Sequence, residues 1–226
     1  KHIKIYSAAG DLMGVVGEGQ VDMPNDMAFD LAGNLYVADS RLDRVAVFDS
    51  GLALSRTIGA GGIEDGQLKF PSSVTVAYRL DAFNNPTGEV FVADQGNCRI
   101  QVFDLQGNFL RKMGAPPFGD GDNYSPTGHF NTVQSLQVDD LYRLHAADSF
   151  MNSVQIFDTQ TGLCSNYYGN PYGMFGSSTG TLYLPLDIHI APTGLVIAAN
   201  HGMGRVEAIY ANPQTRVGLS STVVAE

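Results

Sequence analysis

Tryptophan is absent from this chain of 226 residues, and cysteine occurs only twice, as Cys98 and Cys164. Basic residues are also scarce, with 13 Lys and Arg against 23 Asp and Glu, and the formal net charge is −10. A surface of this sign repels the phosphates of nucleic acids and, more mildly, anionic membranes, so we expect no nucleic-acid partner. The longest apolar runs, such as 195–199, are far too short to span a bilayer.

A secretory leader is not visible, and the chain begins with Lys1 rather than Met. A processed mature chain, a cut piece or a fragment would all begin in this way. Because an exported origin fits a removed leader, we expect an extracellular or periplasmic location rather than a cytoplasmic one. The two cysteines fall in turns expected on opposite faces of a meander, so we predict no disulfide between them.

Turn-forming residues and short β-branched runs are plentiful, with 26 Gly and 10 Pro. The stretch 88–114 shows the pattern most clearly: a strand-like run, a tight polar loop, a second run, a Gly-containing turn and a third run. This order is typical of a β-meander.

The same meander recurs along the chain. Its third strand has five copies, in which an apolar residue always stands second and the middle residue is usually polar. The copies begin at residues 2, 44, 99, 153 and 205, which is a blade-like spacing. The preceding strand recurs as 35–39, 90–94, 144–148 and 196–200, and each copy ends in Asp or Asn. First strands are expected at 24–30, 71–77, 131–138 and 185–190.

This repeated pattern resembles the NHL repeat. The segments 71–74, 92–94 and 97–103 with Gly107 form close to a consensus copy, and the resemblance covers nearly the whole chain. It departs from the pattern where Asn200 replaces Asp and where Ser153 replaces Arg. The resemblance implies an all-β β-propeller of four-stranded antiparallel blades.

We expect about four and a half to five blades in a single propeller over residues 1–226. The predicted boundaries are a half-blade at 1–20 and blades at about 21–62, 63–120, 121–178 and 179–226, the last completed by a strand from 216–224. An unclosed ring leaves unpaired edges. Three solutions stay open: the chain is a fragment, the tail 220–226 pairs with the half-blade, or the edges pair with a second copy.

Polar residues at the loops between second and third strands are the first candidate site. Asp39 faces Arg44 and Asp94 faces Arg99 across such loops, and Arg205 opens the last copy. These five residues are candidates for binding a ligand on one face of the propeller. The alternative is structural: each carboxylate closes its hairpin by accepting loop amides or by pairing with Arg.

Metal ligands are harder to find, because no His or Cys pair has zinc-site spacing. By resemblance, some NHL-like propellers are lyases with axial metal-bound His, and only His189, with Asp187 nearby, lies on an expected inner strand. His145 aligns with Tyr36 and Phe91 and is expected to pack between blades. Asp120 and Asp122 lie in an acidic loop with some calcium-like character. We predict no cofactor, with calcium or zinc as the alternatives.

The nearly equivalent blades favour a non-catalytic protein-binding or scaffold propeller. One alternative is a self-assembling subunit of an extracellular oligomer or filament, built by strand pairing between chains. A further alternative is a metal-dependent lyase or hydrolase with an axial site. The expected partner is therefore a protein, or a second copy that meets this chain through blade edges.

Overall fold

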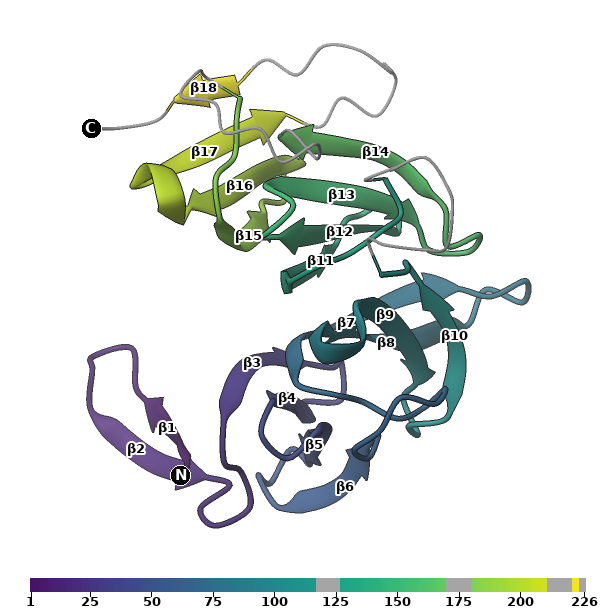
Figure 1. Ribbon diagram of the computed structural model, residues 1–226. Coiled ribbons are helices and arrows are strands. Elements are labelled where there is room, and N and C mark those ends of the chain that lie inside the picture. The colour runs from purple at the N-terminus through teal and green to yellow at the C-terminus, as the bar shows by residue number, and fades with distance from the viewer. Residues whose placement is uncertain (117–126, 170–179, 211–220, 224–226) are drawn as a thin grey trace. The chain divides into compact units, whose positions relative to one another are not determined.

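The structure, a computed structural model, describes residues 1–116, 127–169, 180–210 and 221–223. In these residues the chain forms four four-stranded antiparallel sheets and one two-stranded sheet (Figure 1). The sheets are blades of a β-propeller, as the repeat predicts. They fall into two compact units, residues 1–97 with 101–111 and residues 98–100 with 112–226.

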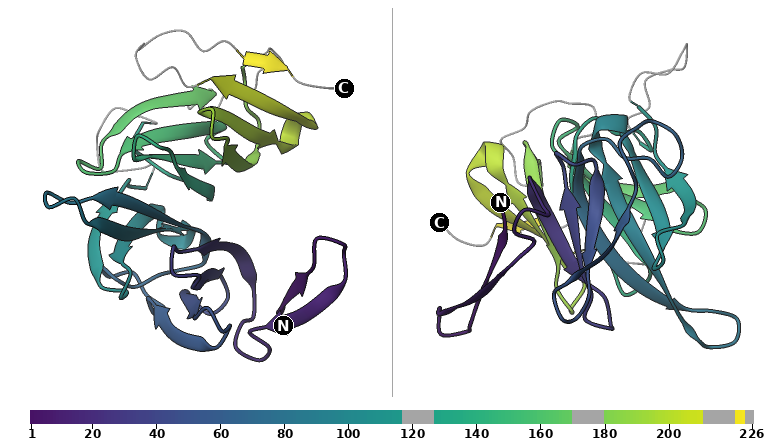
Figure 2. Two further views of the ribbon diagram at one scale, coloured as in Figure 1. Left: turned by 180° about the vertical axis from the view of Figure 1, so that it is seen from behind. Right: turned by 90° about the horizontal axis from the view of Figure 1, so that it is seen from below.

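The first unit begins with a two-stranded sheet of β1 (Ile3–Tyr6) and β2 (Leu12–Val16), drawn in purple in Figure 2. Two complete blades follow. The first contains β3 (Pro24–Phe29), β4 (Leu35–Asp39), β5 (Arg44–Phe48) and β6 (Leu54–Ile58). The second contains β7 (Pro71–Leu80), β8 (Pro86–Asp94), β9 (Arg99–Asp104) and β10 (Phe109–Met113), with the 3₁₀ turn η1 (Gln95–Asn97) before β9.

The second unit repeats this plan in two further blades. One contains β11 (Val133–Val138), β12 (Arg143–Asp148), β13 (Ser153–Asp158) and β14 (Cys164–Gly169). The other contains β15 (Pro185–Ile190), β16 (Leu195–Asn200), the 3₁₀ turn η2 (His201–Met203), β17 (Arg205–Tyr210) and β18 (Ser221–Val223). Because β18 pairs with β17, residues 221–223 complete this blade.

Neighbouring blades in each unit pack face to face, so the middle strands are apolar on both sides. All five residues of β4 are buried. Val45 and Val47 of the first blade pack with Val74 and Val92 of the second, and Ala147 and Val154 share a core with Ile188 and Val196 in the other unit. Ile3 and Ile5 of the half-blade pack against the first blade. Full burial between neighbours explains the continuous apolar runs in the sequence.

The hairpins between first and second strands differ in length, and this difference shapes the site described next. β7 and β8 continue to a turn at residues 81–85, where Asp81 accepts hydrogen bonds from the amides of Phe83 and Asn85. The pairing of β7 with β8 extends to Leu80 and Pro86, so this hairpin is long. In contrast, β15 and β16 are joined by only four residues, 191–194.

Candidate functional site

The repeated carboxylates at the ends of second strands lie buried in three of the four complete blades. Asp39 has no exposed surface and accepts hydrogen bonds from the amides of Asp22 (2.9 Å) and Met23 (2.8 Å). Asp94 is equally buried and accepts from the Lys69 amide (2.7 Å) and from Gln101 Nε2 (2.9 Å). These carboxylates tie the segment entering each blade to its second strand, which is a structural role.

The predicted arginines lie beside these ties. Arg44 donates to the carbonyl of Gln20 (2.6 Å), and Arg205 Nε donates to buried Glu207 (2.5 Å). Arg99 is 8% exposed. Ligand binding by Asp39, Arg44, Asp94, Arg99 and Arg205 stays a prediction, because the hydrogen bonds described above all lie within the chain.

The metal candidates divide between described and undescribed residues. Asp187 and His189 are exposed on β15, and Asp187 accepts a hydrogen bond from the Ser135 hydroxyl (2.7 Å). Asp120 and Asp122 lie outside the described residues. Across the part of the chain that the structure describes, three or more His, Cys, Asp and Glu side chains do not gather as metal ligands. Calcium or zinc binding stays a prediction.

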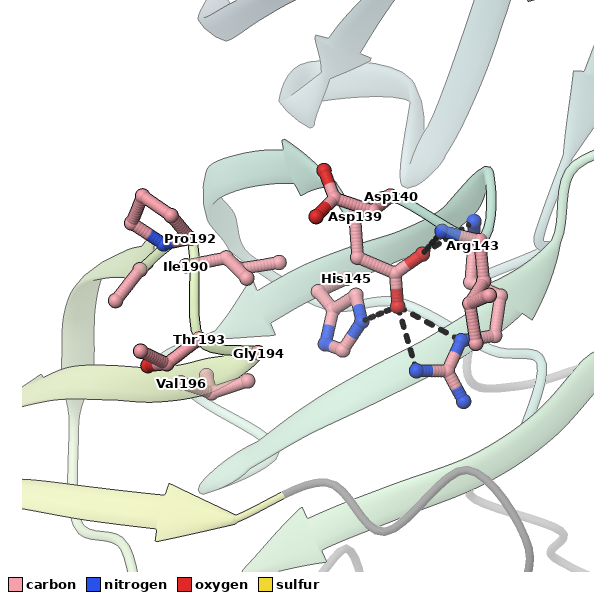
Figure 3. Close-up of a pocket in the computed structure, with 11 residues that line it drawn as sticks. Asp139, Asp140, Arg143, His145, Ile190, Pro192, Thr193, Gly194 and Val196 are labelled. Carbon is pink, nitrogen blue, oxygen red and sulfur yellow. Dashed lines mark hydrogen bonds and ion pairs between the residues drawn. The ribbon is translucent and has the colours of Figure 1, made fainter.

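A pocket of about 270 Å³ lies between the hairpin turns of the two blades of the second unit (Figure 3). One wall is the turn between β11 and β12, and the other is the short turn between β15 and β16. The wall from the first turn carries charge, and the facing wall is mainly apolar. The lining residues are Asp139, Asp140, Leu141, Arg143, His145, Ile190, Ala191, Pro192, Thr193, Gly194 and Val196.

Asp139 is the most highly coordinated side chain of this pocket. Its Oδ1 accepts from the amides of Leu141 (3.0 Å) and Arg143 (2.9 Å). Its Oδ2 accepts from Arg143 Nε (2.7 Å) and contacts His145 Nε2 at 3.1 Å. Burial raises the pKa of Asp139, but the hydrogen bonds from His145 and Arg143 outweigh it and hold the pKa well below its usual value. Asp139 is therefore a fixed anion.

His145 forms the floor of the pocket and has no exposed surface. Its ring stacks on Tyr168, with centroids 6.1 Å apart and an interplanar angle of 27°. Because Nε2 faces a carboxylate, the neutral ring carries its hydrogen there and presents a lone pair at Nδ1. Among the described residues Nδ1 has no hydrogen-bond partner. Figure 3 shows the His145 ring between Asp139 and the side of Thr193 and Val196.

The first unit contains the same polar arrangement. Asp30 occupies the position of Asp139, and Tyr36 occupies that of His145; their side chains are 3.3 Å apart. Arg56 Nη2 donates to the Tyr36 hydroxyl (2.9 Å). Burial raises the pKa of Tyr36 to about 12, and Asp30 and Tyr78 add to the rise. The side chain of Tyr78 reaches this turn, where its hydroxyl accepts from the Leu31 amide (3.1 Å).

Sequence reasoning placed His145 correctly among the buried residues but missed its partners. Asp139 and Arg143 carry a signal that could have found them, because Asp139 stands at the start of the same turn as Asp30. The pocket itself has no local signature, since its second wall comes from a hairpin about 50 residues further along the chain.

Comparison with known proteins bears on the repeats. No family model matches the chain. Protein brain tumor of Drosophila melanogaster is 30% identical over 112 residues, which are 49% of this chain and 10% of that protein. NHL repeat-containing protein 3 of Mus musculus is 31% identical over 115 residues, 45% of this chain and 31% of that protein. The repeats of this chain are similar to NHL repeats.

This chain matches only a tenth to about a third of the length of these relatives. A streptogramin B lyase structure aligns with 99% of the chain and 59% of its own, with a TM-score of 0.59 and 8% sequence identity. That likeness shows the propeller fold alone. In the described residues, no helix has the length and apolar character needed to cross a membrane.

Proposed function

We propose that this chain is a non-catalytic protein-binding propeller, located outside the cytoplasm, that engages its partner through the pocket face of the second unit. The observation that carries the proposal is the pocket itself. Its volume of about 270 Å³ lies below the roughly 300–1,000 Å³ typical of sites for whole small molecules, and it suits one inserted side chain.

The composition of the rim supports the same function. Leu141 is 60% exposed beside Asp140, so an apolar and an anionic side chain stand together at the mouth of the pocket. Interfaces combine a buried anchor with a polar surround. NHL-repeat relatives also favour protein binding as the use of such a propeller.

Selection of peptides from a random displayed library against the immobilised chain tests this function. We expect enriched peptides of micromolar affinity whose binding protects amides of the turns 139–143 and 191–194 from hydrogen exchange. Leu141→Asp should weaken these peptides at least tenfold, whereas Leu163→Asp, at an exposed position near β14, should not. Protection elsewhere, or no enrichment over a blocked surface, contradicts the proposal.

Self-association is a second candidate function. It is favoured by a difference in exposure among residues at the same strand position. Val45, Ile100 and Val154 occupy the second position of a third strand and are fully buried, whereas Val206 at the same position is 48% exposed. In the first unit, Met27 and Phe29 of β3 are also exposed, at 46% and 62%. Apolar blade faces of this kind can be covered by a second copy of the chain.

A further inference from the structure

In the first unit, a tyrosine side chain occupies the position that corresponds to the pocket. In the first unit, the turn that begins at Asp30 contacts the Tyr78 side chain, whose hydroxyl accepts from the Leu31 amide at 3.1 Å. Tyr78 lies on the long β7–β8 hairpin, and the ideal Cβ position of Gly88 lies 2.8 Å from its ring. The ring is therefore held against its own hairpin and pointed at the neighbouring turn.

The second unit lacks this ring because its hairpin is short. Counted from the prolines that begin β7 and β15, Tyr78 corresponds to Pro192, which lies in the 191–194 turn and lines the pocket. By the same count from the first strands, Leu31 corresponds to Asp140. The pocket thus lies where a phenol ring lies in the first unit.

An open backbone amide at the pocket matches a hydroxyl. The amide of Asp140, the counterpart of the donor to Tyr78, forms no hydrogen bond among the described residues. His145 Nδ1 also lacks a partner there, but it is closed to solvent beneath the floor of the pocket. A phenol hydroxyl can accept from the Asp140 amide as Tyr78 accepts from the Leu31 amide, whereas an ammonium group and a phenyl ring cannot accept. Ile190, Pro192 and Val196 supply apolar contact for the ring.

We infer that the pocket binds a tyrosine side chain of the partner protein, in the manner in which the first unit binds Tyr78. This inference rests on the proposed protein-binding function and names its anchor residue. The tyrosine hydroxyl gives the Asp140 amide an acceptor that phenylalanine cannot supply, which favours tyrosine over phenylalanine.

Titration of the whole chain with N-acetyl-tyrosinamide, followed by the ring resonances of ¹³C-labelled His145, tests the inference. We expect saturable shifts with a dissociation constant of roughly 1–10 mM, typical of a ligand with few heavy atoms. N-acetyl-phenylalaninamide should bind about fivefold more weakly, because it lacks one hydrogen-bonding group. N-acetyl-lysinamide should leave the resonances unchanged.

Two variants separate the pocket from the rest of the surface. Pro192→Tyr places the ring in the pocket from within and should abolish binding, while Leu163→Tyr adds the same ring at an exposed position and should not. Equal binding of the phenylalanine compound, stronger binding of the lysine compound, or unchanged binding by Pro192→Tyr overturns the inference.

The peptide selection distinguishes this failure from failure of the proposed function. Enriched peptides that protect the two turns but tolerate replacement of every tyrosine would keep the protein-binding function and refute the tyrosine anchor. Peptides that lose at least tenfold in affinity when one tyrosine becomes phenylalanine, or more when it becomes alanine, support both.

Discussion

At one position of the second strand the four complete blades carry Tyr36, Phe91, His145 and Ile197. The backbone around this position is the same in each blade, but the polar tip of the side chain changes. Tyr36 reaches Asp30 and receives Arg56, whereas His145 reaches Asp139 and leaves Nδ1 unpaired. A residue between two blades can thus be a core residue in one and a site residue in another.

Both oxygens of the Asp139 carboxylate accept hydrogen bonds, so we predict that the stability of the chain depends on pH in the acid range. At neutral pH, Asp139→Asn should reduce the free energy of unfolding by about 3 kcal/mol, because buried donors from Arg143 and His145 lose their acceptor. The folded pKa is lowered, so the stabilisation is complete above the unfolded value near about 3.9 and declines as pH falls below it.

Urea denaturation of both proteins at several pH values checks this prediction. The difference between them should be largest from pH 5 to 7 and should shrink below about pH 4. Asp158→Asn is the comparison for an exposed carboxylate: turn hydrogen bonds from Thr161 lower the pKa of Asp158, so its difference should change with pH in the same direction but be smaller. A difference for Asp139→Asn that stays constant down to pH 3 contradicts the assignment.

At the scale of elements, the blades repeat the hydrogen bonds that join the end of the second strand to the segment that enters the blade. Asp39 and Asp148 accept two amides of that segment each, and Asn200 replaces the carboxylate by accepting from the Tyr183 amide and donating to the Thr181 carbonyl. The side-chain amide of Asn200 therefore binds the same segment with one accepted and one donated hydrogen bond, in place of two accepted ones.

This substitution within the chain predicts an order of stability. Asp39→Ala leaves two amides without their acceptor and should cost about 2–4 kcal/mol, while Asp39→Asn keeps one acceptor and should cost about 1 kcal/mol. Thermal and urea unfolding of the three proteins would show the order. Equal loss for both variants indicates that the tie matters only through the charge of Asp39.

The length of the hairpin between first and second strands also matters at this scale, because it decides whether a ring lies against the neighbouring turn. Tyr78→Ala should open in the first unit the cavity that the second unit already has, at a cost of about 1–3 kcal/mol because Tyr78 is only half-buried. Addition of p-cresol should raise the melting temperature of this variant more than that of the parent chain. An equal effect on both would show that Tyr78 does not fill a cavity.

At the scale of the whole molecule, the exposed blade faces predict the state of association. If Met27, Phe29 and Val206 meet a second copy, size-exclusion chromatography with light scattering should show a mass above 24.2 kDa. Phe29→Glu should then return the mass to that of one chain without changing the circular dichroism spectrum. A monomer at all concentrations of the parent chain excludes self-association.

The fold was largely predictable because each blade repeats one local rule: alternating apolar residues between turns, spaced so that four strands pair in order. The role of Asp39 could not be decided from the sequence. A ligand site and a structural hydrogen bond to the entering segment both place an acid at the same turn. The pocket was not predictable from its residues. Asp139 and Pro192 become neighbours only because two blades pack, and the pocket exists only because the second hairpin is short.

Sequence alone determined that this chain is a set of repeats that resemble NHL repeats and fold as four-stranded blades, because each repeat contains the strand periodicity and the turn residues of one blade. Tertiary structure decided which polar residues form the hydrogen bonds that hold a blade together and which keep a polar atom without a partner. The physical reason is burial: an acid surrounded by amides, such as Asp39, is satisfied, whereas His145 is buried with one nitrogen unpaired at the floor of a pocket. That distinction depends on contacts between blades and not on the residue type.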